Sequence, residues 1–203
     1  MKIKINQKNP EKEKIKIAIN ALRDGKTILY PTDTVYGIGA NIFDVEAVKR
    51  VYIIKNRALN KPLSICVSKI DDIHNIAYLD KDIENMLKDI LPGPFTVILN
   101  KKENVPPILT SGSSKIGIRI PDNKICMELS REFPITTTSA NISGQPVLES
   151  INEILKQLHE EIDLVLDSGN CRHGTHSTVL DMTIYPPKML RKGAALPDFH
   201  FND

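Results

Sequence analysis

The sequence predicts an α/β fold in which one twisted, mixed, open sheet is flanked by helices. Short apolar runs typical of strands alternate with amphipathic helical segments along almost the whole chain. No internal repeat, low-complexity tract or linker divides the 203 residues, and a chain of this length can bury a substantial core. We therefore predict a single domain over residues 1–203, ending in a frayed tail over residues 197–203.

The first half of the chain is expected to begin with an edge strand. Ile3 and Ile5 alternate with lysines, as in a short half-buried strand. Asn9-Pro10 indicates the start of a helix, and Gly25 indicates its end. Apolar runs, caps and flanking prolines then predict a strand over 27–30, a helix over 44–55, a strand over 63–67 and a helix over 80–89.

The second half continues the alternation. Strands are expected over 95–99, 116–120 and 135–138, with a helix over 123–132 before the last of them. A helix over 150–159 and a strand over 164–166 follow, and strands over 177–181 and 188–191 close the domain. This order of elements is the main reason for predicting an α/β fold.

Charge and cysteine content exclude several classes of protein. The chain has 27 basic and 25 acidic residues, so its formal net charge of +2 argues against coating nucleic acid by bulk charge. Three isolated cysteines without a C-x-x-C pair argue against a disulfide scaffold or a cysteine-rich zinc site and fit a reducing compartment. Without a signal core or a long apolar run, we expect a cytoplasmic protein that does not enter a membrane.

Polar and cationic segments lie at or beside the ends of the expected strands. Open α/β sheets bind ligands at the carboxyl ends of their strands, so these segments predict one shared site. The segments are 31–37, 55–57 with Lys61, Arg119, 136–144 and 174–178, with Arg191 as a further cation.

Two of these segments suggest anion binding. Lys55, Arg57 and Lys61 form either a solvated face past a helix end or a clamp for phosphate. The run that contains Thr137, Ser139, Asn141 and Ser143 is either an ordinary turn or a loop whose backbone N–H groups approach an anion.

Arg119 and Asp33 are the other charged candidates. Arg119 lies between isoleucines late in a strand, so it either faces a polar cavity, which we favour, or ends the strand at the surface. Asp33 lies in a Thr-Asp-Thr turn and could hold a cationic ligand or a magnesium-bound water, although a plain turn is the simpler interpretation.

Other signatures are missing from the sequence. His173 and His176 are three residues apart without a carboxylate at zinc-protease spacing, so we predict no protein-held metal. There is no Walker A motif, no G-x-G-x-x-G, no G-x-S-x-G elbow and no carboxylate pair suited to glycoside hydrolysis.

Eight short motifs in order resemble one family, the threonylcarbamoyl-AMP synthases with their YrdC-type domain, over about residues 10–193. The matching stretches are PTDTVYGIGA from Pro31, IKNR from Ile54, KPLSICV from Lys61, PGPFTVIL from Pro92, IGIRIP from Ile116, TTSANISG from Thr137, GTHSTVLD from Gly174 and MLRKG from Met189.

The resemblance implies a YrdC-like fold with a concave, positively charged cavity. It implies an ATP-dependent synthase that makes threonylcarbamoyl-adenylate and pyrophosphate from L-threonine, bicarbonate or CO2, and ATP. A separate transferase complex would then modify adenosine 37 of ANN-decoding tRNAs, and direct contact with tRNA is a further expectation. Mg²⁺ would arrive with ATP.

The resemblance also implies roles for residues at matching positions. L-threonine would be held by Thr34, Arg119, Thr137 and Ser177. ATP would be held by Arg57, Ser139, Asn141 and Arg191. Lys55, Arg57 and Lys61 would act in catalysis by placing positive charge over the phosphates.

The sequence departs from the family pattern at five positions, for which no role is carried over. They are Cys66, Lys115, Val147, His176 and Lys192. The chain also stops ten residues past Gly193, so we expect the single-domain form.

Two other functions stay open. One is an RNA-binding module without turnover, which the near-neutral charge weakens. The other is carbamoyl-adenylate chemistry on a different acceptor, as in related domains fused within hydrogenase-maturation proteins.

Overall fold

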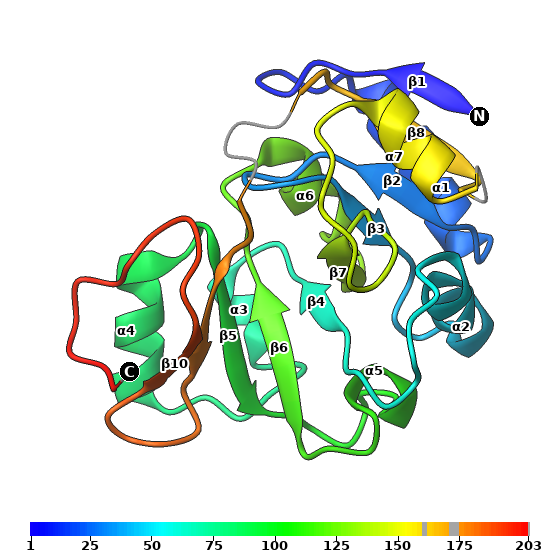
Figure 1. The fold of residues 1–203 in the computed structure, drawn as a ribbon. Coiled ribbons are helices and arrows are strands. Elements are labelled where there is room, and N and C mark those ends of the chain that lie inside the picture. Colours follow the sequence, from blue (N-terminus) through cyan, green and yellow to red (C-terminus); the bar gives the residue numbers. More distant parts are fainter. Residues whose placement is uncertain (160–161, 171–174, 203) are drawn as a thin grey trace.

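The structure, a computed structural model, describes residues 1–159, 162–170 and 175–202. In this part of the chain, ten strands form one open, twisted sheet in the order β1-β8-β2-β3-β7-β4-β6-β5-β9-β10 (Figure 1). The strands are β1 (Lys2–Lys4), β2 (Ile28–Tyr30), β3 (Gly37–Gly39), β4 (Ser64–Cys66), β5 (Phe95–Asn100), β6 (Lys115–Arg119), β7 (Ile135–Ser139), β8 (Leu164–Asp167), β9 (Thr178–Asp181) and β10 (Lys188–Arg191). The prediction of a mixed α/β fold with an open sheet is confirmed.

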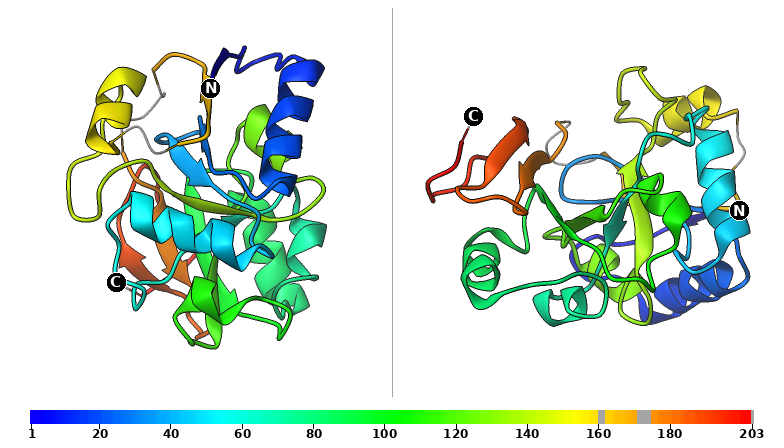
Figure 2. Two further views of the ribbon diagram at one scale, coloured as in Figure 1. Left: turned by 90° about the vertical axis from the view of Figure 1, so that its right-hand side faces the viewer. Right: turned by 90° about the horizontal axis from the view of Figure 1, so that it is seen from below.

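Helices lie on both faces of this sheet, and α1 and α7 lie on opposite sides of the end formed by β1, β8 and β2 (Figure 2). The helices are α1 (Lys12–Arg23), α2 (Val45–Ile54), α3 (Ile70–Ile73), α4 (Lys81–Ile90), α5 (Pro107–Thr110), α6 (Lys124–Leu129) and α7 (Ile151–Gln157).

Short polar side chains fix where several helices begin. The Asp44 carboxylate accepts hydrogen bonds from the first turn of α2, Asp80 does the same for α4, and Asn123 for α6. Helix α1 begins at Lys12, two residues after the expected start at Pro10. The reason is that the Asn6 side chain accepts hydrogen bonds from the two backbone N–H groups before Pro10 and holds that segment in a turn.

Three short elements were not expected from the sequence: β3, α3 and α5. Strand β3 is the one that matters for the site, and its glycines are unusual in a strand. They leave room for the ring of Tyr30, because a Cβ atom at Gly39 would lie 2.9 Å from a ring carbon of Tyr30. Glycine here reflects close packing against an aromatic ring, which the local pattern does not reveal.

The two faces of the sheet are covered by different helices. Ile28 and Tyr30 of β2 pack with α1 and α6, together with Cys66 and Ile135. Leu29, between them in sequence, points to the opposite face and joins the larger core that includes α2, α4 and α7. The larger core is therefore covered along most of the sheet, whereas α1 and α6 cover only part of their face.

The expectation of a frayed tail is wrong for the described residues. Asn202 forms a parallel bridge with Lys188, its carbonyl accepts from the Met189 N–H at 2.7 Å, and Phe199 packs against the core. The physical reason is that β10 is an edge strand with free backbone groups, which this segment satisfies. The two termini lie at opposite ends of the molecule (Figure 1).

Candidate active site

A polar cavity of about 160 Å³ brings together seven of the ten predicted site residues. They come from the loops after β2 and α2, from the strands β6, β7 and β10, and from the segment that leads into β9. The seven are Thr34, Arg57, Arg119, Thr137, Ser139, Ser177 and Arg191.

The cavity lies on one face of the sheet and not at a row of carboxyl ends. Strand β4 runs parallel to β6 but antiparallel to β7, so the carboxyl ends of neighbouring strands point in opposite directions. The pairings Ser64 with Thr137 and Cys66 with Arg119 place these side chains on the face that α1 and α6 partly cover. The site therefore occupies the stretch of this face beyond those helices, which corrects the expectation from strand ends.

Arg119 is the most deeply buried cation of the cavity, with 7% of its surface exposed. Its Nη2 atom donates to Asp33 at 2.8 Å and to the Thr34 hydroxyl at 3.0 Å, while its buried Nε–H has no hydrogen-bond partner. The second oxygen of Asp33 accepts from the backbone N–H of Asp122 at 3.2 Å. Asp33 thus serves as the counter-ion of Arg119, and both of its oxygens are engaged.

The hydrogen-bond partners of the Thr34 hydroxyl fix which bonds it donates and which it accepts. Thr32 donates its own hydroxyl proton to the Val35 carbonyl at 2.7 Å, so the 3.0 Å contact between the two threonine hydroxyls is donated by Thr34. Thr34 also accepts from Arg119. One lone pair of Thr34 is left to accept a hydrogen bond from a ligand.

Arg57 is held in place by backbone carbonyls. Its Nε donates to the carbonyl of Lys61 at 3.1 Å and its Nη2 to that of Pro62 at 2.8 Å. The segment after α2 therefore fixes the orientation of the Arg57 guanidinium, which can then bind an anion in the cavity. Lys61 contributes through its carbonyl, a role that the sequence did not suggest, while its side chain is exposed and does not line the cavity.

Lys55 and Asn141 do not line the cavity but lie behind it. The Lys55 ammonium donates to the carbonyls of Ser139 and Asn141 and to the Asn141 side chain. The Asn141 side chain also accepts from the Ser139 hydroxyl at 2.6 Å and donates to the carbonyl of Gln145. The structure therefore places these two residues as supports of the 139–145 loop.

Ser177 and Arg191 contact each other directly. Arg191 donates twice to the Ser177 carbonyl, at 3.0 and 3.2 Å, and once to its hydroxyl at 3.3 Å. Burial, and secondarily the charge of Arg119, lowers the pKa of Arg191. The two residues that the resemblance assigned to different substrates thus belong to one cluster.

Sequence reasoning missed several lining residues, of which Ser64 and Thr96 are the clearest. Both are hydroxyl residues within apolar strands, and that signal could have identified them. His176 also lines the cavity, and burial together with the charges of Arg191, Lys55 and Arg119 lowers its pKa.

Three of the departures from the family pattern lie outside the cavity lining. Cys66 is fully buried, Lys115 pairs with Asp181 at 2.9 Å, and Val147 does not contribute to the lining. His173 and Gly174 lie outside the described residues.

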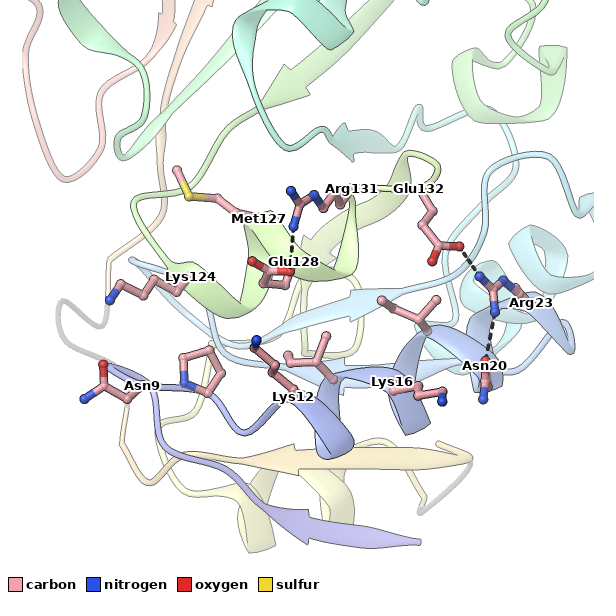
Figure 3. A pocket seen from close by; sticks show the side chains of 13 residues that line it. Asn9, Lys12, Lys16, Asn20, Arg23, Lys124, Met127, Glu128, Arg131 and Glu132 are labelled. Carbon is pink, nitrogen blue, oxygen red and sulfur yellow. Dashed lines mark hydrogen bonds and ion pairs between the residues drawn. The ribbon is translucent and has the colours of Figure 1, made fainter.

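A larger groove of about 770 Å³ lies between α1 and α6 (Figure 3). Its floor contains Ile15 and Ile19, and two ion pairs on its wall join Arg23 to Glu132 and Arg131 to Glu128. None of the predicted site residues lines it. Size alone would therefore point away from the predicted site residues.

In the described ranges, no cluster of three or more potential metal ligands occurs. Over the same residues, no helix combines the length and apolar character that crossing a bilayer requires.

Comparison with known proteins identifies the family to which the chain is similar. The Sua5/YciO/YrdC family model, described as telomere recombination, matches residues 20–193. A putative threonylcarbamoyl-AMP synthase of Methanocaldococcus jannaschii is 42% identical over 180 residues, covering 88% of this chain and 86% of that protein. The threonylcarbamoyl-AMP synthase of Pyrococcus abyssi is 38% identical over 186 residues, covering 90% of this chain but only 55% of the relative.

The fold comparison agrees. The crystal structure of P. abyssi Sua5 complexed with L-threonine superposes with a TM-score of 0.89 at 37% identity, covering 95% of this chain and 57% of that one. The present chain thus spans just over half the length of the P. abyssi protein. Because the family model covers most of the chain and the fold agrees, this protein belongs to the Sua5/YciO/YrdC family.

Proposed function

We propose that this protein is an L-threonylcarbamoyladenylate synthase, which converts L-threonine, bicarbonate or CO2, and ATP into threonylcarbamoyl-AMP and pyrophosphate. The observation that carries the proposal is the unpartnered, buried Nε–H of Arg119 inside a cavity lined by two further arginines and several hydroxyls. A buried donor without a partner is costly, so it favours a ligand oxygen at that place.

The polarity of the lining suits an amino acid beside a triphosphate. Arg119 offers a donor to a carboxylate, and Thr34 offers an acceptor to an amine. Arg57 and Arg191 add two guanidinium groups that suit phosphate oxygens. The relatives' names support this assignment, since they are threonylcarbamoyl-AMP synthases and one of their structures contains L-threonine.

The chemistry needs no enzyme nucleophile. The threonine amine adds to CO2 and loses a proton, which gives a carbamate. A carbamate oxygen then attacks the α-phosphorus of ATP, the bond to the β-phosphate oxygen breaks, and pyrophosphate leaves. Positioning and neutralisation of charge are what such a transfer requires, and arginines with hydroxyls supply both.

We propose that Mg²⁺ arrives bound to ATP. Carboxylates are the usual protein ligands of this ion, and the cavity lining of the described residues contains none. Asp33, the neighbouring carboxylate, is engaged by Arg119 and by the Asp122 N–H.

We further propose that a tRNA threonylcarbamoyl transferase complex consumes the product in the cytoplasm, with tRNA contact at the surface. Lys61 is retained as a candidate for phosphate contact through its exposed ammonium. Lys55 we now assign to support of the 139–145 loop and not to direct catalysis.

The test is a pyrophosphate-release assay on the purified protein with ATP, bicarbonate and L-threonine. We expect release that depends on L-threonine. Release stimulated by carbamoyl phosphate instead would favour a different acceptor, and RNA binding without turnover would favour the RNA-binding module.

Arg57→Ala should lower kcat/KM for ATP by about 2–4 kcal/mol in transition-state free energy, because a charge-assisted contact is lost. Arg131→Ala, which removes an exposed arginine paired with Glu128, is the matched control and should leave the kinetics unchanged. Wild-type kinetics in Arg57→Ala would exclude Arg57 from phosphate binding.

A further inference from the structure

Thr96 of β5 lines the cavity next to Ser177 and has 5% of its surface exposed. The hydroxyl oxygens of these two residues are 2.8 Å apart, and geometry alone allows either to donate. Neither the sequence motifs nor the relatives assign a role to Thr96.

The two possible directions of this hydrogen bond leave different groups free for a ligand. The Ser177 oxygen already accepts from Arg191 at 3.3 Å. The hydroxyl of Thr96 has no second hydrogen-bond partner in the described part of the protein. If Ser177 donated to Thr96, the Ser177 proton would be used within the pair, and Ser177 would have no proton left for a ligand in the cavity.

Donation by Thr96 leaves the Ser177 proton free for a ligand. Both lone pairs of Ser177 are then occupied, one by Thr96 and one by Arg191, so the Ser177 proton is the one group left to bind elsewhere. Ser177 lines the cavity, and its proton would therefore be offered to an acceptor atom of a ligand.

We propose that Thr96 is a positioning residue that makes Ser177 a hydrogen-bond donor toward an oxygen of the amino-acid substrate, its carboxylate by chemistry. This inference rests on the proposed function, because it takes L-threonine as the ligand. The two hydroxyls then have opposite roles toward the substrate: Ser177 donates a hydrogen bond to it and Thr34 accepts one from it.

Register supports the placement of Thr96. Strand β5 pairs Val97 with Ile118 of β6, so Thr96 lies beside Arg119 and projects from the same face. Strand β9 pairs Val179 with Thr96. The Thr96 hydroxyl is thus held by a strand of the sheet and not by a loop. A rigid position of this kind suits a residue that orients the Ser177 hydroxyl.

The experiment compares Thr96→Val, which keeps the shape but removes the hydroxyl, with Thr96→Ser, which keeps the hydroxyl. Binding of L-threonine is measured by calorimetry without ATP, and KM values for both substrates are measured by pyrophosphate release. Thr110→Val is the matched control, because Thr110 is a buried threonine whose hydroxyl bonds within α5 and lies outside the cavity lining.

We expect Thr96→Val to weaken L-threonine binding about tenfold and to raise its KM equally, with the KM for ATP changed less than about threefold. Thr96→Ser should stay within about twofold of the wild type, as should Thr110→Val. Equal KM changes for both substrates, or failure of Thr96→Ser to restore binding, would overturn the inference. The KM for ATP is the check on folding, because a misfolded Thr96→Val protein would lose its use of both substrates together.

The outcomes also separate this inference from the proposed function. If the wild type fails to bind L-threonine, the proposed function itself is wrong and the role of Thr96 with it. If the wild type binds L-threonine and Thr96→Val binds it equally well, the proposed function stands and the role of Thr96 is rejected.

Discussion

At the scale of single residues, Lys55 shows how a cation can serve a site without facing it. Its side chain is 1% exposed and its ammonium is surrounded by oxygens of Ser139 and Asn141. The carbonyl of Lys55 in turn accepts from the Ser143 N–H at 2.8 Å. Lys55 thus joins the end of α2 to the loop that carries Ser139, with bonds in both directions.

The charge of Lys55 makes this connection dependent on pH. Burial, and secondarily the charge of Arg57, lowers the pKa of Lys55 from 10.5 to about 7. Between those two values the unfolded chain binds more protons than the folded chain. The contribution of Lys55 to stability therefore rises with pH across this window, with a slope of at most about 1.4 kcal/mol per pH unit.

We predict that urea denaturation of the wild type and of Lys55→Met will diverge as the pH rises from 7 toward 10.5. The wild type should gain stability relative to the variant, because the variant lacks the titrating group. Lys61→Met, which removes an exposed lysine of the same segment, should run parallel to the wild type. Parallel curves for Lys55→Met would show that Lys55 titrates normally.

At the scale of elements, the site depends on the close approach of the segment after β10 to the start of β9. The Gly193 N–H donates to the Thr178 hydroxyl at 3.0 Å, and the Ala194 N–H donates to the His176 carbonyl at 2.9 Å. A Cβ atom at Gly193 would lie closer than 3.0 Å to backbone atoms of His176, Ser177 and Thr178. Only glycine permits this distance, and Lys192 before it does not prevent the approach.

We predict that Gly193→Ala will raise the KM for L-threonine and for ATP together, because it separates the backbone segments that carry Ser177 and Arg191. Overpacking of this kind costs about 1–3 kcal/mol of stability. Gly112→Ala is the control, since Gly112 has a φ of +78° but open space around it. It should cost about 1 kcal/mol through backbone strain and leave both KM values unchanged. An effect of Gly193→Ala on one substrate alone would contradict this account.

At the scale of the whole molecule, the sheet has one face covered along most of its length. In the described part of the chain, α1 and α6 are the helices that cover the other face. The cavity lies on that second face beyond α1 and α6, where hydroxyls and arginines replace apolar side chains. The edge strand β10 supplies Arg191, and the C-terminal segment pairs with this strand. The end of the chain therefore stabilises one wall of the site.

We predict that the Met189 N–H, which donates to the Asn202 carbonyl, is protected from hydrogen exchange. A chain ending at Leu196 should exchange this proton at least about tenfold faster, because its acceptor is gone. The Met182 N–H, which donates to the Ile98 carbonyl at 3.0 Å, is an internal reference and should not change. Equal exchange of Met189 in both chains would mean that the C-terminal segment frays in solution.

Much of the fold follows from local sequence. The caps Asp44, Asp80 and Asn123 mark helix starts to within a residue, and runs such as 95–99 and 116–120 mark the strands. Short elements such as β3 were not predicted, because glycines are unfavourable in strands. Strand β3 forms because its glycines allow close packing against the ring of Tyr30.

The sequence by itself pointed to most residues of the candidate site: the arginines, the hydroxyls of Thr34, Thr137 and Ser139, and the loop after β7. Only the tertiary structure decided how they meet. In the fold, Lys55 forms a hydrogen bond with Asn141 and supports the loop, and Asp33 pairs with Arg119. Thr96 forms a hydrogen bond with Ser177. The physical reason is that strand direction and register arise from pairings between distant segments, so a local pattern specifies which side chains are polar but not which of them share a face.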